Sequence, residues 1–433
     1  MNSVRLPHLK ASAEISTAPL FLPKSVMVSL SMSIGAPCEP VVKIGDTVKT
    51  GQLIADSDAF MSAPVHAPVT GVVTRETTLT AANGKKTRAL VIETANKQEL
   101  SDEVKPPVIN SREDFLKAVR ASGAVGQGGA GFPLHIKLGF DPKKQPVDYL
   151  LINGAECEPY TTSDYRELIE RGEDVISGIK LILRHISIPK AIIGIESDKP
   201  LAIKKMRSLT ENEPDISVAP LPTGYPQGAE KVLVYSCTKR VVNEGSLPVS
   251  AGCVVVNVST TAFVARYIKT GVPLIEKRVS IDGDIVNKPE NIFVPIGTTL
   301  AEITARTNLR LVPGKVIFGG MMMGTTVYDP DTPVTKTTGA ILFFAGTGSA
   351  EKPLTSCIRC ARCVNACSMS LAPTELEHAF DRKDAALLQK LHVNLCMDCG
   401  ACSYVCPAGR NLAEKNQLAK AFLRSKGSLS KIG

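Results

Sequence analysis

Two runs of cysteine constrain this chain more than any other feature of its sequence. Eight of its twelve cysteines repeat the pattern C-x2-C-x2-C-x3-C, first as Cys357, Cys360, Cys363 and Cys367 and then as Cys396, Cys399, Cys402 and Cys406. Three thiolates separated by two residues can wrap a short loop around three corners of one iron-sulfur cube, whereas the fourth cysteine begins the next helix and points away. The spacing therefore predicts two [4Fe-4S] clusters.

The fourth cysteine of each run is expected to ligate the cluster of the other run, as this spacing requires. One cluster is thus assigned to Cys357, Cys360, Cys363 and Cys406, and the other to Cys396, Cys399, Cys402 and Cys367. Structural zinc usually takes two separated pairs of ligands, and many disulfides are typical of small secreted domains. Both alternatives fit this long chain less well than iron-sulfur clusters do.

The composition limits the classes of protein to which the chain can belong. Its 433 residues predict about three domains at ~150 residues each. No uncharged apolar run approaches the ~18 residues of a membrane-spanning helix, and the first residues lack the features of an export signal. We therefore expect a protein on the cytoplasmic side with no transmembrane segment of its own.

The net charge of +8 suits phosphate-bearing cofactors, acidic partners or an anionic membrane surface, and does not choose among them. Aromatic residues make up only 5% of the chain, none of them is Trp, and no basic run is interleaved with stacking side chains. These observations argue against a nucleic-acid partner.

The first hundred residues predict a small all-β module, because short strand-like segments alternate with turn signals between residues 26 and 95. The segments VVKIGDTVKTGQLI and APVTGVV resemble the halves of a biotinyl or lipoyl carrier sandwich. The hairpin between them, residues 57–66, contains no lysine to carry a cofactor. We expect a structural or docking role for this module, and a packing role for its His66.

A glycine-rich loop follows a helix expected over residues 111–121, which Ser111 can cap. The loop GQGGAGFP spans residues 126–133 and contains the formal pattern G-x-G-x-x-G, but a helix precedes it where a dinucleotide-binding turn needs a strand. We interpret it as a loop whose backbone approaches a phosphate or a flat ring, with Lys137 adding charge. A flexible surface loop is the alternative.

Alternating strand and helix patterns then predict a parallel sheet with helices on its faces. The expected strands cover residues 147–153, 191–195 and 216–221, and the expected helices cover residues 165–186 and 200–210. The first strand runs into NGAECEP at residues 153–159, where two carboxylates and an amide could bind ribose hydroxyls or a carboxamide. A solvated acidic loop is the other interpretation.

Residues 273–345 predict a compact α+β module with a short helix at residues 299–306. Within it, the methionine turn at residues 319–324 is expected to face the core, since Met is an adaptable packing residue. After Cys406 the chain ends in a basic segment with an apolar stripe, which could dock on an acidic partner or lipid, or form a solvated helix.

Together these motifs closely resemble the C subunit of the Rnf complex, a membrane-bound ferredoxin:NAD oxidoreductase that couples electron transfer to ion pumping. The specific marks are IGAP at residues 34–37, HAPVTG at 66–71, GQGGAGFP, NGAECEP, CVNAC and CSYVCPA. The middle of the chain is also similar to the flavin- and NADH-binding subunit of respiratory complex I, through the glycine loop and the acidic strand end.

The resemblance implies a multidomain α/β plus β architecture. It comprises a barrel-sandwich hybrid over residues 1–98, an FMN- and NADH-binding α/β domain with a parallel sheet over 99–271, an SLBB-like β-grasp domain over 272–348 and a two-cluster ferredoxin-like helical domain over 349–433.

The same resemblance implies which residues bind the flavin and the nicotinamide cofactor. Gly126, Gly128, Gly129 and Lys137 would hold the FMN phosphate, and Asn153, Glu156 and Cys157 the rest of the flavin; Phe132 and Glu158 would lie against NADH; and Glu230, Asn257, Ser259 and Thr260 would complete the pocket. The chain departs from its complex I relatives at Ala229, where they carry a glutamate, and at Gln127, where an arginine is common.

The implied function is that of a peripheral subunit on the cytoplasmic side of the cell membrane. It would exchange electrons between NAD(H) and FMN and relay them through two [4Fe-4S] clusters to the membrane subunits of the complex, with ferredoxin as an indirect partner. The alternatives are a soluble flavin and iron-sulfur reductase, for example of a corrinoid, and a cluster-carrying adaptor that is no enzyme.

Overall fold

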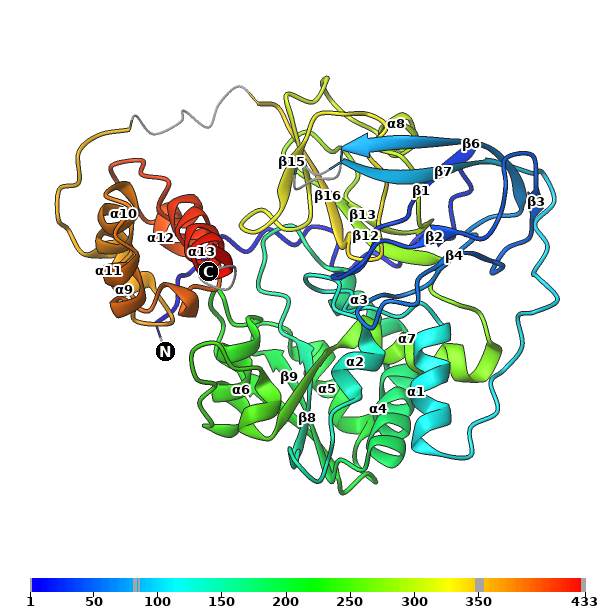
Figure 1. Ribbon diagram of the computed structural model, residues 1–433, viewed down its shortest axis with the longest axis horizontal. Helices are drawn as coiled ribbons and strands as arrows, with labels where there is room; N and C mark the ends of the chain where they lie inside the picture. Colours follow the sequence, from blue (N-terminus) through cyan, green and yellow to red (C-terminus); the bar gives the residue numbers. More distant parts are fainter. Residues whose placement is uncertain (1, 81–83, 85, 347–353, 430–433) are drawn as a thin grey trace.

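The computed structural model describes residues 2–80, 84, 86–346 and 354–429. The domain boundary expected between residues 348 and 349 lies outside the described residues. Figure 1 shows three parts that contain β-sheets packed together, and a separate group of C-terminal helices beside them. The described start of the chain lies next to those helices, where Asn2 donates to the Cys367 carbonyl.

The N-terminal part contains two small antiparallel sheets that enclose the side chains of Val26, Val28 and Ile54. One sheet has the order β1-β7-β6-β3 and the other β2-β4-β5. Their bounds are β1 Ser25–Ser29, β2 Glu39–Pro40, β3 Thr47–Val48, β4 Leu53–Asp56, β5 Val65–His66, β6 Gly71–Thr80 and β7 Lys86–Thr94. This confirms the all-β module that the sequence predicts. His66 is a packing residue, but its buried Nδ1 atom has no hydrogen-bond partner in the described chain.

The central part is built on a four-stranded parallel sheet in the order β10-β9-β8-β11. The strands are β8 Tyr149–Gly154, β9 Lys190–Glu196, β10 Ile216–Leu221 and β11 Cys253–Asn257. The helices are α1 Arg112–Ala121, α2 Leu134–Leu138, α3 Ser163–Glu170, α4 Gly172–Ile186, α5 Pro200–Leu209, α6 Glu230–Thr238, the 3-10 turn η1 Pro248–Ala251 and α7 Val258–Thr270.

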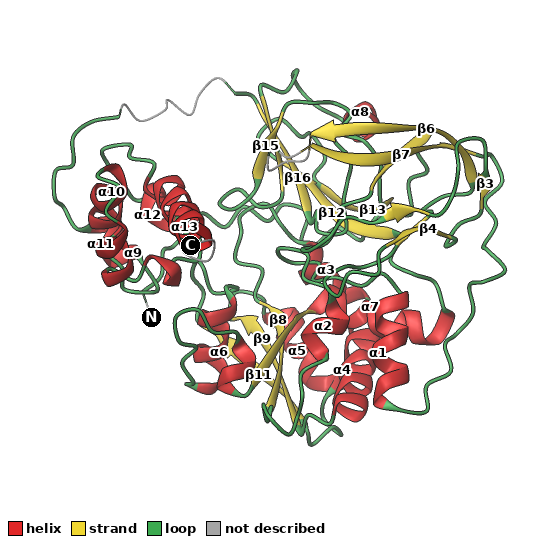
Figure 2. Ribbon diagram, viewed as in Figure 1, coloured by secondary structure: helices red, strands yellow, loops and turns green. Residues whose placement is uncertain are grey.

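Side chains alternate between the two faces of this sheet. Leu150 and Ile152 of β8 pack into the core under α4 and α7, whereas Leu151 packs with Leu233 of α6. Figure 2 shows α6 on one face and α4 and α7 on the other. Strands buried on both faces need the nearly continuous apolar sequence that these strands have, and the predicted parallel sheet is confirmed.

The single helix expected over residues 165–186 is wrong, because the chain breaks it at Arg171. This residue adopts φ −129° and ψ 33°, which separates α3 from α4. Its guanidinium lies 4.3 Å from the centre of the Phe293 ring in the next module. A Cβ on Gly172 would come within 2.8 Å of Leu209 Cδ1 of α5. Tertiary packing therefore breaks a pattern that is continuous in sequence.

The third part is a five-stranded mixed sheet in the order β13-β12-β16-β14-β15, covered by one helix. The elements are β12 Glu276–Asp282, β13 Glu290–Pro295, α8 Leu300–Arg306, β14 Lys315–Phe318, β15 Thr325–Val327 and β16 Ala340–Phe344. The expected α+β module is confirmed. The expectation that the methionine turn faces the core is wrong, since Met321 and Met323 are 44% and 55% exposed.

The C-terminal part consists of several short helices and one long helix, α13, around a small apolar core that includes Leu376, Leu388 and Ala419. They are α9 Arg362–Ala366, α10 Pro373–Asp381, α11 Ala385–Lys390, the 3-10 turn η2 Val393–Leu395, α12 Ala401–Tyr404 and α13 Leu412–Leu429. In the basic tail, Lys415 and Lys420 form ion pairs with Asp381 and Asp398 of the same part. Among the described helices, none is long and apolar enough to cross a membrane.

Candidate functional site

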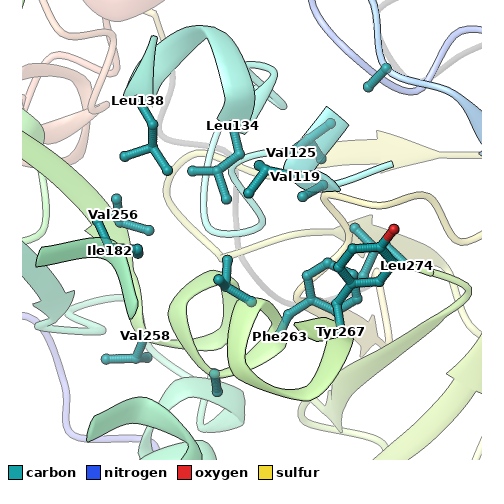
Figure 3. Close-up of a cluster of buried hydrophobic side chains, with 14 of the residues drawn as sticks. Val119, Val125, Leu134, Leu138, Ile182, Val256, Val258, Phe263, Tyr267 and Leu274 are labelled. Atoms are coloured by element: carbon teal, nitrogen blue, oxygen red, sulfur yellow. The ribbon is translucent and has the colours of Figure 1, made fainter. Parts of the chain in front are cut away.

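The glycine loop is a tight loop whose two ends are joined by an antiparallel β-bridge. Val125 and Pro133 form an isolated bridge, and the Gly126 N–H donates to the Phe132 carbonyl at 2.9 Å. Figure 3 shows the apolar side chains of Val125 and Leu134, on either side of the loop, joining one buried cluster. The core therefore fixes both ends of the loop.

The tip of the loop is exposed and its backbone donors are available. Gly128, Gly129 and Ala130 are exposed, and within the described chain their N–H groups donate to no protein acceptor. A Cβ on Gly128 would lie 2.6 Å from Asn257 Nδ2, whereas a Cβ on Gly129 would meet nothing within 4 Å. Backbone N–H groups without a protein acceptor, in a loop where a side chain at Gly128 would occupy the space, are suited to binding the oxygens of a phosphate. The loop thus fits the phosphate end of a flavin.

The ends of strands β8 and β11 bring two predicted residues side by side. Asn153 and Asn257 are paired in register at the carboxyl edge of the parallel sheet. Asn153 Nδ2 donates to the Gly228 carbonyl at 2.8 Å, which holds the segment before α6. Asn257 caps α7 by accepting from the N–H groups of Ser259 and Thr260. Ligands in open parallel sheets bind beyond this edge.

A half-buried acid that the sequence did not predict joins these residues. Asp164, in the first turn of α3, accepts from Asn257 Nδ2 at 2.6 Å and from Ser259 Oγ at 2.7 Å. Burial, and then the nearby Glu156 carboxylate, raise the pKa of Asp164 to about 6. An acidic residue in the first turn of a helix is common, so no sequence signal marked this one.

Gln127 and Lys277 form a second buried pair that the sequence did not predict. The Gln127 N–H donates to Thr260 Oγ1 at 3.0 Å, and its Oε1 accepts from Lys277 Nζ at 3.0 Å. Lys277 comes from β12 of the third part, and burial lowers its pKa to about 8. The Lys277 ammonium, which belongs to another module, therefore holds the glycine loop in place through its hydrogen bond with Gln127.

Lys137 and Glu230, both of which the family resemblance assigned to the flavin pocket, form an ion pair. Lys137 Nζ donates to Glu230 Oε1 at 2.6 Å and to the Val255 carbonyl at 3.1 Å. The pair connects α2, which follows the glycine loop, with the first residue of α6. Each side chain keeps part of its surface exposed, so the ammonium can still meet a charged ligand.

The acidic strand-end loop is more constrained than the sequence suggested. The Glu156 carboxylate accepts from the N–H groups of Asp164 and Tyr165, and so caps α3. Lys10 Nζ donates to the carbonyls of Glu156, Glu158 and Thr161 at 2.9, 2.7 and 2.6 Å. The N-terminal segment therefore holds this loop in place.

Cys157 and Glu158 complete the loop. Burial raises the pKa of the Cys157 thiol to about 12, so it stays neutral at pH 7. Its Sγ accepts from the Gly228 N–H at 3.5 Å. The Glu158 carboxylate accepts from the N–H groups of Met322 and Met323 at 2.8 and 3.1 Å, and burial raises its pKa. Phe132 is half-buried on the glycine loop.

Seven of the eight cysteines of the two runs fall into two groups that cross the runs. After burial, the nearby charges of Cys406 and Cys357 raise the pKa of Cys363. Burial likewise raises the pKa of Cys399 and of Cys402, and the nearby Cys367 adds to the rise at both thiols. A small hollow in the C-terminal part is lined by Cys367, Cys396, Cys399 and Cys402 together with neighbouring residues.

This grouping fits iron-sulfur cubes. No disulfide joins any of the twelve cysteines, all of which lie in described ranges. Over the described residues, no three His, Cys, Asp or Glu side chains converge closely enough to ligate one metal ion. A [4Fe-4S] cube distributes four thiolates over four irons and does not need such convergence.

Comparison with known protein families matches three of the four parts, namely the N-terminal, the central and the C-terminal part. Residues 2–97 match the RnfC barrel sandwich hybrid domain, residues 119–266 match the Nuo51 FMN-binding domain, and residues 353–410 match the 4Fe-4S dicluster domain. The first match covers the two antiparallel sheets, the second covers the glycine loop and the parallel sheet, and the third covers both cysteine runs.

A curated relative of similar length decides the family. The chain is 40% identical over 371 residues to the C subunit of the proton-translocating ferredoxin:NAD(+) oxidoreductase complex of Clostridium ljungdahlii, covering 84% of this chain and 80% of that one. This chain belongs to the family of C subunits of ion-translocating oxidoreductase complexes. The C subunit of the Na(+)-translocating complex of Acetobacterium woodii is 37% identical, over 90% of this chain and 89% of that one. The Rhodobacter capsulatus relative is 36% identical, over 88% and 74%.

The fold of this family member also matches a solved enzyme structure. The crystal structure of an NAD+-reducing [NiFe]-hydrogenase in the H2-reduced state matches with a TM-score of 0.53 and 20% identity, covering 72% of this chain and 63% of that chain. At this identity the likeness concerns the fold alone.

Proposed function

We propose that this chain is the C subunit of an ion-translocating ferredoxin:NAD oxidoreductase complex, an NADH-dependent flavin and iron-sulfur oxidoreductase subunit. The observation that carries the proposal is the exposed glycine loop, whose free N–H groups lie beside the carboxyl edge of a parallel sheet, in the same chain as two crossed groups of cysteines. The names of the relatives support it.

The FMN site proposed here is assembled from the glycine loop, α2, the end of β8 and the loop after it, the start of α6, and the junction of β11 with α7. The N–H groups of Gly128 and Gly129, with Gly126 and Lys137, hold the phosphate, and the paired Asn153 and Asn257 mark the edge of the sheet beyond which the rest of the flavin lies. The other members are Glu156, Cys157, Glu230, Ser259 and Thr260, with Phe132 and Glu158 assigned to the side of NADH.

These side chains differ in how they serve the site. Glu156 and Asp164 shape it by capping α3 and by holding Asn257, as their hydrogen bonds indicate. Lys137 offers a partly exposed ammonium, which suits the negative charge of a phosphate. When bound, FMN supplies a centre that accepts two electrons together and releases them singly.

The two cluster sites follow the crossed assignment. Cys357, Cys360, Cys363 and Cys406 hold one [4Fe-4S] cluster, and Cys396, Cys399, Cys402 and Cys367 hold the other. The grouping of the thiols supports this division. Burial raises the pKa of four of these thiols, those of Cys363, Cys396, Cys399 and Cys402, and binding iron requires their deprotonation.

The finer architecture and location belong to the same proposal. The domain bounds are those expected from the sequence, and the five-stranded sheet with α8 is assigned to the SLBB-like β-grasp type. The chain is placed on the cytoplasmic face of the membrane as a peripheral subunit that meets the other subunits of the complex, with ferredoxin as an indirect partner.

Cofactor analysis of the protein purified without oxygen tests this function. We expect about eight irons per chain, as two cubes require, one FMN per chain, and loss of the flavin absorbance when NADH is added. Zinc in place of iron would contradict the proposal. Clusters without any response to NADH would favour an adaptor, and failure to co-purify with membrane subunits would favour a soluble reductase.

A further inference from the structure

Three separate parts of the molecule meet at the second cysteine group. The Tyr225 hydroxyl, from the central part, donates to the Cys399 carbonyl at 2.5 Å. The Met322 carbonyl, from the methionine turn, lies 3.0 Å from where a Cβ on Gly400 would stand. Asn2 Nδ2, from the N-terminal segment, donates to the Cys367 carbonyl at 3.3 Å. All three contacts fall on the loops that carry this group of cysteines.

The loop that carries the first three cysteines of the first run, Cys357, Cys360 and Cys363, makes no comparable contact. Residues 354–362 are exposed except for the half-buried Cys357, and Leu354 and Ile358 are 74% and 66% exposed. Residues 396–400 of the second run are all half-buried. Within the described chain, no hydrogen bond or ion pair joins residues 354–366 to residues 2–346. The two cluster sites therefore differ in their relation to the rest of the molecule.

Tyr225 connects the second group to the acidic strand-end loop. Its side chain is fully buried, and its backbone forms a bridge with Val4. The Glu158 carboxylate lies beside the same hydroxyl that meets Cys399. Glu158 in turn accepts from the N–H groups of Met322 and Met323. The buried Tyr225 hydroxyl thus contacts Glu158, at the edge of the proposed flavin site, and the backbone of Cys399, a proposed cluster ligand.

We propose that the cluster site of Cys367, Cys396, Cys399 and Cys402 is the one coupled to the nucleotide-binding part, and that Tyr225 is the positioning residue that holds it there. The inference rests on the proposed function. The hydroxyl directs its O–H dipole at the carbonyl of a ligand residue, which stabilises the additional negative charge of a reduced cluster. Hydrogen bonding around a cluster sets its potential in this way.

Tyr225→Phe tests the proposal, because it keeps the ring and removes only the hydroxyl. The full chain with its clusters reconstituted is titrated with a reductant and followed by EPR, and Cys360→Ser identifies the signal of the first site. We expect the reduced fraction of the second-site cluster at a fixed potential to fall several-fold in Tyr225→Phe. The first-site cluster should be unchanged.

Glu244→Gln is the matched control. Glu244 Oε2 meets His392 Nδ1 at 2.6 Å, which is another contact between the same two parts that touches no cysteine loop. This variant should leave both EPR signals as in the wild type. An equal effect of both variants on the second site, a change at the first site in Tyr225→Phe, or no change in either would overturn the proposal.

The result is separate from the test of function. If the wild-type chain holds no clusters, the proposed function fails. If it holds two clusters and bleaches with NADH while Tyr225→Phe leaves the second site unaltered, the function stands and only the role of Tyr225 is lost.

Discussion

Gly128 is a residue of the glycine loop that tertiary contacts constrain. Its missing side chain leaves room for the Asn257 amide, which caps α7 and also donates to Asp164. Gly129 is adjacent and equally exposed, yet nothing surrounds the position of its absent Cβ. Two glycines that are equivalent in the sequence pattern thus have different reasons to be glycine.

Gly128→Ala should lower the free energy of unfolding by about 1–3 kcal/mol, the usual cost of forcing atoms into a packed site. It should also weaken FMN binding, because Asn257 must move. Gly129→Ala should change stability by less than about 0.5 kcal/mol. Chemical unfolding of both variants and fluorescence titration with FMN measure this difference. Equal stability of the two variants would show that the Asn257 contact is unimportant.

At the scale of elements, two short helices explain why the cysteine runs cross. Cys363 lies in α9 and Cys367 follows its last residue, while Cys402 lies in α12 and Cys406 follows shortly after it. The two helices contact each other. The short helix in each run therefore places the fourth cysteine near the loop of the other run. The three residues between the third and fourth cysteines are compatible with this placement.

Replacing the fourth cysteines one at a time tests the crossing directly. Cys367→Ser should damage the cluster of Cys396, Cys399 and Cys402, and Cys406→Ser should damage that of Cys357, Cys360 and Cys363. EPR of the reduced variants, with iron analysis, distinguishes the two sites. If each change harmed only the cluster of its own run, the crossed assignment would be wrong even though the function could stand.

For the whole molecule, Lys336 is the residue at which three parts meet. It lies in the third part, is 1% exposed, and its Nζ donates to the Pro64 carbonyl of the N-terminal part at 2.6 Å and the Gly123 carbonyl of the central part at 2.8 Å. Burial lowers its pKa to about 8. The parts are thus joined by a buried cation as well as by apolar contact.

Lys336→Met should destabilise the chain at pH 7 by about 1–3 kcal/mol, because two buried carbonyls lose their donor. The pKa of Lys336 is lower in the folded state than in the unfolded state, so between pH ~8 and ~10.5 the folded state binds fewer protons. Wild-type stability therefore gains up to about 3 kcal/mol from this group as the pH rises through that window. Lys336→Met should lack this gain, so its deficit widens with pH.

Chemical unfolding at a series of pH values measures the effect. Lys315→Met is the control, since Lys315 is exposed in the same part and its loss should change stability by less than about 0.5 kcal/mol at every pH. A constant difference between Lys336→Met and the wild type would contradict the assignment of the shifted pKa to this residue.

Local pattern in the sequence determined much of this protein. The spacing of eight cysteines predicted the kind of metal centre, and apolar periodicity predicted the parallel sheet, because both signals depend on neighbours along the chain. Asn153 ends a strand that the sequence predicted, whereas Asn257 came from the family resemblance, and their pairing was found only in the structure. The pocket residues taken from the family resemblance remain a prediction.

Only the tertiary structure decided which polar groups face one another. Lys277 reaches Gln127 of the glycine loop, and Asp164 reaches Asn257, from segments far apart in sequence. Arg171 breaks a helix by reaching Phe293 in another module. The methionine turn faces outward because its N–H groups bind Glu158. Such contacts depend on how the modules pack, and no local pattern of residues encodes that packing.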